Sequence, residues 1–132
     1  MSTLVIDTSA LVAIALEEPE CDAFIALLED VDDLLISPMT YVELGVVLVR
    51  RRFLPSRKNI EGWLAEHRIR TAQLATIETI ALDAYLQYGK GRHAARLNLG
   101  DCFSYALAKA LDAPLLYKGD DFSRTDVRSA LA

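Results

Sequence analysis

The sequence predicts an α/β fold in which a small parallel sheet is covered by helices on both faces. Short apolar runs alternate with longer segments of helical periodicity, and this alternation is typical of βαβ units. The chain has 132 residues, about the length of one domain, and neither a repeat nor a linker divides it. Its composition, with 52% hydrophobic and 25% charged residues, is that of a globular protein. We therefore expect residues 1–132 to form a single domain.

In the first half of the chain we expect two strands and three helices. The apolar runs at residues 4–6 and 34–36 have the length of short buried strands, and each is followed at once by a polar residue. Helical periodicity is found over residues 8–16, 20–29 and 40–53. The third of these helices opens with Thr40 and Glu43, which have the spacing of a capping box.

The second half continues the alternation. Ser56 is placed to cap a helix that runs to about residue 67, after Pro55 interrupts the previous one. Further helices are expected at residues 77–88 and 100–111, a weaker strand at residues 71–75 and a short strand at residues 114–117. Between these helices, residues 89–98 are basic and resemble a loop.

Composition excludes several classes of protein. No apolar run approaches the roughly 20 residues of a membrane helix, because Asp7 and Glu17 interrupt the longest N-terminal one. That stretch also lacks the basic residues that begin a signal peptide. Cys21 and Cys102 form neither a disulfide framework nor the spacing of a zinc site. We therefore expect a protein of the reducing cytoplasm that does not associate with membranes.

The net charge of −5 is distributed unevenly along the chain. Residues 1–49 contain ten acidic and no basic residues, whereas residues 50–99 contain ten basic and four acidic ones. Residues 100–132 are nearly balanced, with four basic and five acidic residues. Such asymmetry within one small domain favours a polyanionic partner beside an acidic, metal-binding centre. For any single charged residue, a solvated helix face is the simpler explanation.

Acidic residues follow the predicted strands at several points. Asp7 comes directly after the first strand, and Asp120 and Asp121 come after the last one. Glu43 and Asp101 lie in the first turns of predicted helices. Because the carboxyl ends of parallel strands meet at one edge of the sheet, where ligands bind in open α/β folds, we expect these acids to converge on one cleft.

Each acid also has a local explanation. Asp7 and Asp101 are placed to stabilise helix N-termini, with Asn98 as a candidate cap, and Asp120 and Asp121 suit a turn. Taken together the local explanations weaken, because clustered carboxylates repel one another and raise their pKa values unless a cation compensates them. An oxygen-seeking ion such as Mg²⁺ or Mn²⁺ fits, and the chemistry it favours is phosphodiester hydrolysis.

Four segments of the chain resemble PIN-domain proteins, in particular the VapC ribonuclease toxins of bacterial toxin–antitoxin pairs. They are VIDTSALVA at residues 5–13, SPMTYVEL at residues 37–44, YGKGRH with LNLGDCFSYALA at residues 88–93 and 97–108, and PLLYKGDDF with TD at residues 114–122 and 125–126. The resemblance spans nearly the whole chain apart from about residues 50–76. Each motif alone is moderately specific, but four of them in order are a strong signal.

The resemblance implies a three-layer α/β/α fold with a sheet of four or five parallel strands, and RNA cleavage that depends on Mg²⁺ or Mn²⁺. It also implies inhibition by a small VapB-like antitoxin. The catalytic and metal-binding positions that match the family are Asp7, Glu43, Asp101 and Asp120. Asp7 and Asp101 match the residues that hold the metal most directly, whereas Glu43 matches an acid that completes the site or orients the attacking water.

The resemblance leaves two assignments open, the fourth acid and a hydrogen-bond donor to the site carboxylates. Asp120 is our choice as the fourth acid, although Asp121 is adjacent and the spacing before Phe122 varies in the family. Thr8 or Ser9 is placed to donate a hydrogen bond to a site carboxylate, and an ordinary helix N-terminus explains the same residues equally well.

Two other features suggest partners. Lys90, Arg92, His93 and Arg96 are candidates for contacts to RNA phosphates, because they precede the helix that carries Asp101. Residues 44–49 are apolar nearly all round their helix, which indicates either core burial or an interface with a second copy or the antitoxin. We expect a homodimer.

Two other functions compete with the nuclease. A phosphotransferase with Asp7 as nucleophile is disfavoured, because Ser9 stands where a second carboxylate would be needed. The main alternative is a non-catalytic PIN-like module that binds RNA or a protein. The presence of all four acids argues against it, because a degenerate site should have lost at least one.

Overall fold

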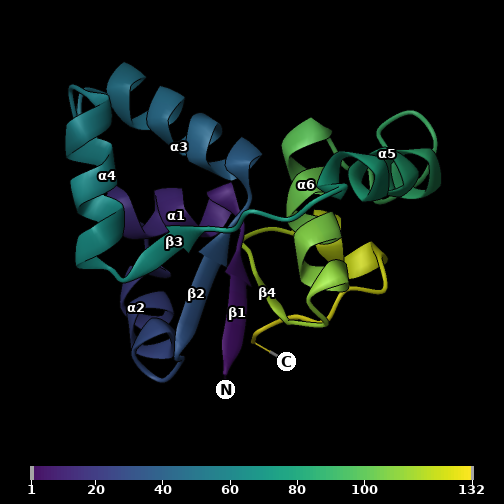
Figure 1. Cartoon of the computed structure of the whole chain (residues 1–132), viewed down its shortest axis with the longest axis horizontal. Helices are drawn as coiled ribbons and strands as arrows, with labels where there is room; N and C mark the ends of the chain where they lie inside the picture. Colours follow the sequence, from purple (N-terminus) through teal and green to yellow (C-terminus); the bar gives the residue numbers. More distant parts are fainter. Residues whose placement is uncertain (1, 132) are drawn as a thin grey trace.

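The computed structural model describes residues 2–131 and contains a four-stranded parallel sheet with the strand order β3-β2-β1-β4 (Figure 1). The strands are β1 (Thr3–Ile6), β2 (Asp33–Ile36), β3 (Ile69–Thr71) and β4 (Leu115–Leu116). β1 lies in the centre, where Leu4 pairs with Leu34 of β2 and Val5 pairs with Leu115 of β4. All strands therefore end at the same edge of the sheet.

Helices cover both faces of the sheet. They are α1 (Thr8–Ala15), α2 (Cys21–Glu29), α3 (Pro38–Arg50), α4 (Arg57–Glu66), α5 (Ile77–Tyr88) and α6 (Leu99–Ala110), with a short 3-10 helix, η1 (Asp121–Arg124), after β4. Figure 1 shows α3 and α4 grouped on the left of the view and α5 and α6 on the right. The sequence-based prediction of an α/β fold with a parallel sheet of four or five strands is confirmed.

One apolar cluster lies on each face of the sheet, between the sheet and the helices that cover it. Leu4 and Ile6 of β1 pack with α1 to α4, whereas Val5 between them packs with α5 and α6. β4 divides in the same way, with Leu116 in the first cluster and Leu115 in the second. The alternation of side chains along each strand therefore places one core on each face of the sheet, as in a three-layer α/β/α protein.

The predicted start of α3 is wrong. Ser37, rather than Thr40, caps this helix, because its extended backbone lets its hydroxyl accept a hydrogen bond from the Thr40 backbone N–H. Pro38 occupies the first turn, where its missing N–H costs nothing. Glu43 thus lies one turn further into the helix than a capping box requires. Its carboxylate is available for other partners.

Other element bounds differ by a few residues. α3 ends at Arg50 rather than at residue 53, and the chain turns at Arg52, which has a left-handed φ of 58°. The third strand is found at Ile69–Thr71 rather than at residues 71–75. It begins directly after Arg68, another residue with positive φ, which leads the chain from α4 back to the sheet. No helix in the described part of the chain is long and apolar enough to span a membrane.

Candidate active site

Carboxylates from four elements line one cavity of about 280 Å³ at the carboxyl ends of the strands. Its acidic residues are Asp7 after β1, Glu43 in α3, Asp101 in α6 and Asp121 at the start of η1. The other lining residues are Thr8, Ser9, Asn98, Lys118 and Phe122. The sheet topology thus brings together acids from distant parts of the sequence.

Asp7 is the most buried of the four acids, with 3% of its surface exposed. It caps α1, because its Oδ2 accepts hydrogen bonds from the backbone N–H of Ser9 at 3.0 Å and from the Ser9 hydroxyl at 2.7 Å. Its Oδ1 accepts a third hydrogen bond, at 2.7 Å, from the hydroxyl of Ser104 in α6. Three donors therefore hold this carboxylate in one orientation.

Behind Asp7, a chain of buried hydroxyls connects α6 to α3. The Ser104 hydroxyl lies 3.3 Å from Thr40 Oγ1, and the Ser37 hydroxyl donates to Thr40 Oγ1 at 3.2 Å. All three side chains are fully buried. Sequence reasoning missed Ser104, although its position three residues after Asp101 places both side chains on the same side of α6.

Glu43 is held by Thr8 and by the close approach of Gly100. The Thr8 hydroxyl donates a hydrogen bond to Glu43 Oε1 at 2.7 Å. A Cβ atom at position 100 would overlap the Glu43 carboxyl group, so any larger residue there would displace this end of the Glu43 side chain from its present position. Burial raises the pKa of Glu43, the Thr8 hydrogen bond opposes this effect, and the charge of Asp7 adds to it.

Asp101 has the most strongly perturbed pKa of the acids in the cavity. It forms a capping box at the start of α6, in which its Oδ2 accepts from the Asn98 backbone N–H and its own N–H donates to Asn98 Oδ1. Burial raises its pKa from 3.8 to about 7, the Asn98 hydrogen bond opposes this, and the charges of three neighbouring carboxylates add to it. Those neighbours are Asp7, Asp121 and Glu43.

At the fourth position, the geometry favours Asp121 over our sequence-based choice of Asp120. Asp121 lines the cavity, whereas Asp120 is not among the lining residues. The short 3-10 helix explains the difference. Asp121 is its first residue, whereas Asp120 precedes it, and the Asp120 carbonyl accepts a hydrogen bond from the Ser123 hydroxyl.

The basic loop between α5 and α6 does not line the cavity. Lys90, Arg92 and His93 are exposed, and Arg96 is exposed with a left-handed φ of 57°. Arg92 donates to the carbonyl of Leu86, and the ring of His93 accepts from the Ala95 backbone N–H. The loop leads directly into Asn98, which lines the cavity, but none of these four side chains lines it.

The cavity offers the donors that a hard divalent cation prefers. Its ligating groups are carboxylate oxygens. Burial together with mutual repulsion raises the pKa values of Glu43 and Asp101, and a bound cation would relieve this repulsion. Within residues 2–131, however, no three Asp, Glu, His or Cys side chains already have the arrangement of a metal site. The Glu43 and Asp101 carboxylates instead accept hydrogen bonds from the Thr8 hydroxyl and the Asn98 N–H.

Comparison with known proteins decides the family. A model of the PIN domain matches residues 4–128. The chain belongs to the PIN-domain family. Among its relatives are the VapC ribonuclease Mb0640 of Mycobacterium bovis and the ribonuclease VapC of Mycolicibacterium smegmatis. Each is 44% identical over 128 residues, covering 94% of this chain and 95% or 97% of the relative. The predicted resemblance to VapC ribonuclease toxins is confirmed.

Solved structures agree on the PIN fold. VapC20 of Mycobacterium tuberculosis, a toxin that cleaves the sarcin–ricin loop, superposes with a TM-score of 0.74 at 16% identity and covers 94% of this chain and 95% of its own. VapBC2 of Rickettsia felis, bound to a DNA fragment from its promoter, gives a TM-score of 0.70 at 13% identity, with 96% of both chains covered. At these identities the likeness shows the fold alone.

Proposed function

We propose that this PIN-domain protein is a metal-dependent endoribonuclease and acts as the toxin of a toxin–antitoxin pair. The observation that carries the proposal is the convergence of Asp7, Glu43, Asp101 and Asp121 on one cavity at the carboxyl edge of the sheet. The VapC ribonucleases at 44% identity support RNA as the substrate. Mg²⁺, or Mn²⁺ in its place, would be held by these carboxylates, where it would favour water attack and stabilise charge on the phosphate.

The residues around the acids have distinct roles in this proposal. Asp7 accepts hydrogen bonds from Ser9 and Ser104, so it supplies a carboxylate held in one orientation. Thr8 orients Glu43, which is placed to orient water. Asp101, with a pKa of about 7, changes charge most readily near neutral pH, and a neighbouring cation would favour its ionised form.

The loop before α6 is proposed to guide RNA toward the cavity. Lys90, Arg92 and Arg96 present charges along the approach to Asn98, and phosphate contacts of this kind make binding dependent on salt. His93 is part of the same predicted set. Its ring nitrogen Nδ1 is occupied by Ala95, so its contribution is smaller than that of the three cations.

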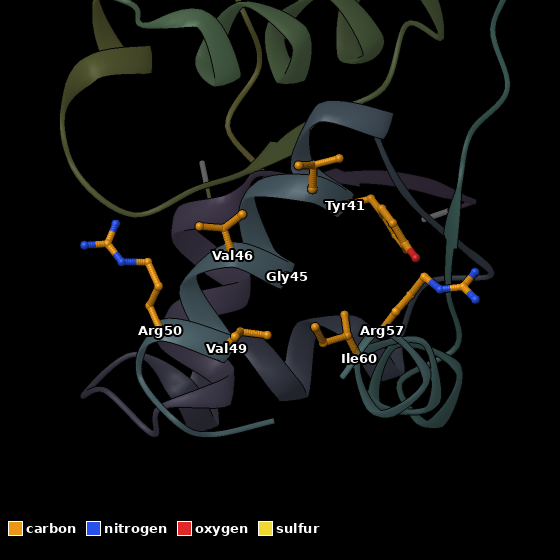
Figure 2. A pocket seen from close by; sticks show the side chains of 8 residues that line it. Tyr41, Gly45, Val46, Val49, Arg50, Arg57 and Ile60 are labelled. Atoms are coloured by element: carbon orange, nitrogen blue, oxygen red, sulfur yellow. The ribbon is translucent and has the colours of Figure 1, made fainter. Parts of the chain in front are cut away.

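An apolar groove between α3 and α4 is proposed to bind the VapB-like antitoxin. Val42, Val46 and Val49 of α3 are 56%, 49% and 45% exposed and line a groove of about 410 Å³. Figure 2 shows Arg50 and Arg57 on opposite sides of this groove. Arg50 and Arg57 carry positive charge at the edges of this apolar groove, and an apolar segment with acidic residues would complement them.

The proposed homodimer uses a different face. Leu82 of α5 and Leu99 of α6 are 60% and 62% exposed, and they line an apolar hollow together with Tyr85 and Phe103. Large exposed apolar side chains gathered on one surface are typical of protein interfaces. Of the residues that the structure describes, Glu78 is the one charged residue that lines this hollow, so the face is mostly apolar and is suited to contact its own copy.

The test compares cleavage of total RNA by the wild-type chain and by Asp101→Asn, each with EDTA, Mg²⁺ or Mn²⁺. We expect cleavage by the wild type only when a metal is present. The Asp101→Asn protein should remain folded and inactive, which also excludes a contaminating nuclease. Equal cleavage by both proteins would contradict the assignment of the site. RNA binding by the wild type without cleavage in any condition would instead favour the non-catalytic module.

A further inference from the structure

Lys118 is the one basic side chain among the described residues that line the acidic cavity. It lies shortly after β4 and precedes Gly119, whose φ of +100° turns the chain toward Asp121. A lysine inside a cluster of carboxylates would ordinarily pair with them and cancel the charge that attracts a metal ion. The groups that Lys118 actually pairs with therefore show whether it neutralises the acids of the cavity.

The Lys118 ammonium pairs with two acids outside the cavity, in the connection between α1 and α2. Its Nζ lies 2.9 Å from Glu18 Oε1 and 3.2 Å from Glu20 Oε1. The hydrogen bond to Glu18, and then the ion pair with Glu20, raise the pKa of Lys118, so the amine stays charged. The three side chains are each about one third exposed, so the ammonium is oriented but remains accessible to a ligand.

The backbone of Lys118 is tied to the site as well. Its N–H donates to the Ser9 hydroxyl at 3.0 Å, and that hydroxyl donates to Asp7 Oδ2 at 2.7 Å. The main chain at Lys118 is therefore fixed relative to the most buried carboxylate of the cavity. This connection and the two glutamates hold the ammonium at the rim in a defined position.

We propose that Lys118 positions the substrate by binding an RNA phosphate at the rim of the cavity, while Glu18 and Glu20 hold its ammonium in place. This inference rests on the proposed ribonuclease function. Lys118 follows β4 and lines the cavity itself, whereas the basic loop joins the cavity only through Asn98. An RNA strand that reaches the carboxylates would therefore meet Lys118 directly, and the glutamates keep the lysine from neutralising the acids.

Binding of a labelled single-stranded RNA oligonucleotide tests this inference without cleavage if all proteins carry Asp101→Asn. Fluorescence anisotropy is measured over a series of salt concentrations. Lys118→Gln should weaken binding about tenfold at low salt and reduce the slope of log affinity against log salt by about 0.7, the loss of one phosphate contact. Lys118→Arg should restore most of the affinity, because it keeps the charge.

The matched control is Lys109→Gln, which removes an exposed lysine from another ion pair, with Asp126 at 3.1 Å. This control should change neither the affinity nor the slope. With the active site intact, Lys118→Gln should raise KM and leave kcat nearly unchanged. If Lys118→Gln shows no cooperative thermal unfolding transition, Lys118→Met is used in its place, because methionine keeps most of the apolar stem of lysine.

Failure of this inference is distinguishable from failure of the proposed function. Metal-dependent cleavage combined with RNA binding by Lys118→Gln that equals the Lys109→Gln control overturns the role of Lys118 and leaves the nuclease standing. Weakened binding with a reduced salt slope supports Lys118 as a phosphate contact, even where the wild type cleaves no RNA. A purely structural ion pair would lower the melting temperature and leave the salt slope unchanged.

Discussion

The acidic cavity and the apolar groove lie on different sides of the same helix, α3, and they are built on different principles. Glu43 reaches the cavity, where Thr8 and Gly100 fix its carboxyl group. One residue earlier along the helix, Val42 lines the groove and is 56% exposed. The cavity thus depends on directional contacts between elements, whereas the groove depends on exposed apolar area.

This difference predicts how each region responds to change. Hydrogen-bonded carboxylates in a cavity lose function when they move by a fraction of an ångström, because orientation contributes strongly to catalysis. An apolar surface tolerates small displacements, since the hydrophobic effect has no direction. Substitutions in the cavity should therefore mainly change activity, and substitutions in the groove should mainly change association.

Gly100→Ala should have the largest effect on the cavity, because it disturbs the contact that fixes Glu43. The added methyl group would overlap the Glu43 carboxyl group, so Glu43 or α6 must shift. We expect RNA cleavage to fall about 100-fold, while the free energy of unfolding changes by less than about 1 kcal/mol, because the displaced group is the end of a flexible side chain. Cleavage rates and urea unfolding of the purified protein measure the two effects.

Gly62→Ala is the matched control, because Gly62 lies within α4 and a Cβ atom there meets no neighbour within 4 Å. It should leave cleavage unchanged and stabilise the helix by up to about 1 kcal/mol. Full activity in Gly100→Ala would show that the Glu43 position is not critical. The proposed distinction between the two regions would then not hold.

The stability of the metal-free protein should fall as the pH rises from about 4 to about 7. In the native chain the pKa of Asp101 is raised from 3.8 to about 7, so in this window the native state holds a proton that the unfolded state has lost. We expect a decline on the order of 2 kcal/mol, about half the full linkage value because water screens the open cavity. Urea unfolding in EDTA across this pH range measures it.

Two further measurements assign the decline to the cavity. The Asp101→Asn protein should show a flatter profile, because it lacks the group with the most raised pKa. Mg²⁺ should stabilise the wild type above pH 7, since a ligand that binds only the native state adds stability. A flat profile for the wild type in EDTA would mean that the carboxylates do not interact as described.

Ser104→Ala should reduce both stability and activity by smaller amounts. It removes a buried donor from Asp7 and leaves Thr40 without one neighbour. We expect a loss of about 1–2 kcal/mol in the free energy of unfolding and about tenfold in cleavage. Ser56→Ala is the control, because it removes the cap of α4 at a cost of about 1 kcal/mol but lies away from the cavity. Equal activity of the two variants would contradict a positioning role for Ser104.

Much of the fold and most of the acids of the site were predictable, because both depend on local patterns and on one topological rule. Apolar runs located β1 and β2, and the convergence of parallel strand ends brought Asp7, Glu43 and Asp101 together. Asp7 both caps α1 and lines the cavity, so its interpretation as a helix cap and its interpretation as a site acid were compatible.

The remaining features depend on distance in space rather than on sequence spacing. Ser104 contacts Asp7 across 97 positions, and the close approach of Gly100 to the Glu43 carboxyl group exists only where α6 meets α3. The choice between Asp120 and Asp121 depends on how the first turn of η1 is oriented. Because two identical acids stand side by side in the sequence, their order alone does not indicate which one faces the cavity. The partner groove depends on which valines of α3 the neighbouring α4 leaves uncovered.

The smallest expected effect on the fold, and the sharpest test of the groove, comes from Val46→Asp compared with Leu82→Asp. Both residues are about half exposed or more, so each change should alter the free energy of unfolding by no more than about 0.5 kcal/mol. Light scattering of the purified proteins then reports association alone. We expect Leu82→Asp to be a monomer and Val46→Asp to remain a dimer, because Leu82 lies on the proposed dimer face and Val46 in the groove proposed for the antitoxin. A monomer for Val46→Asp and a dimer for Leu82→Asp would instead assign the groove to self-association.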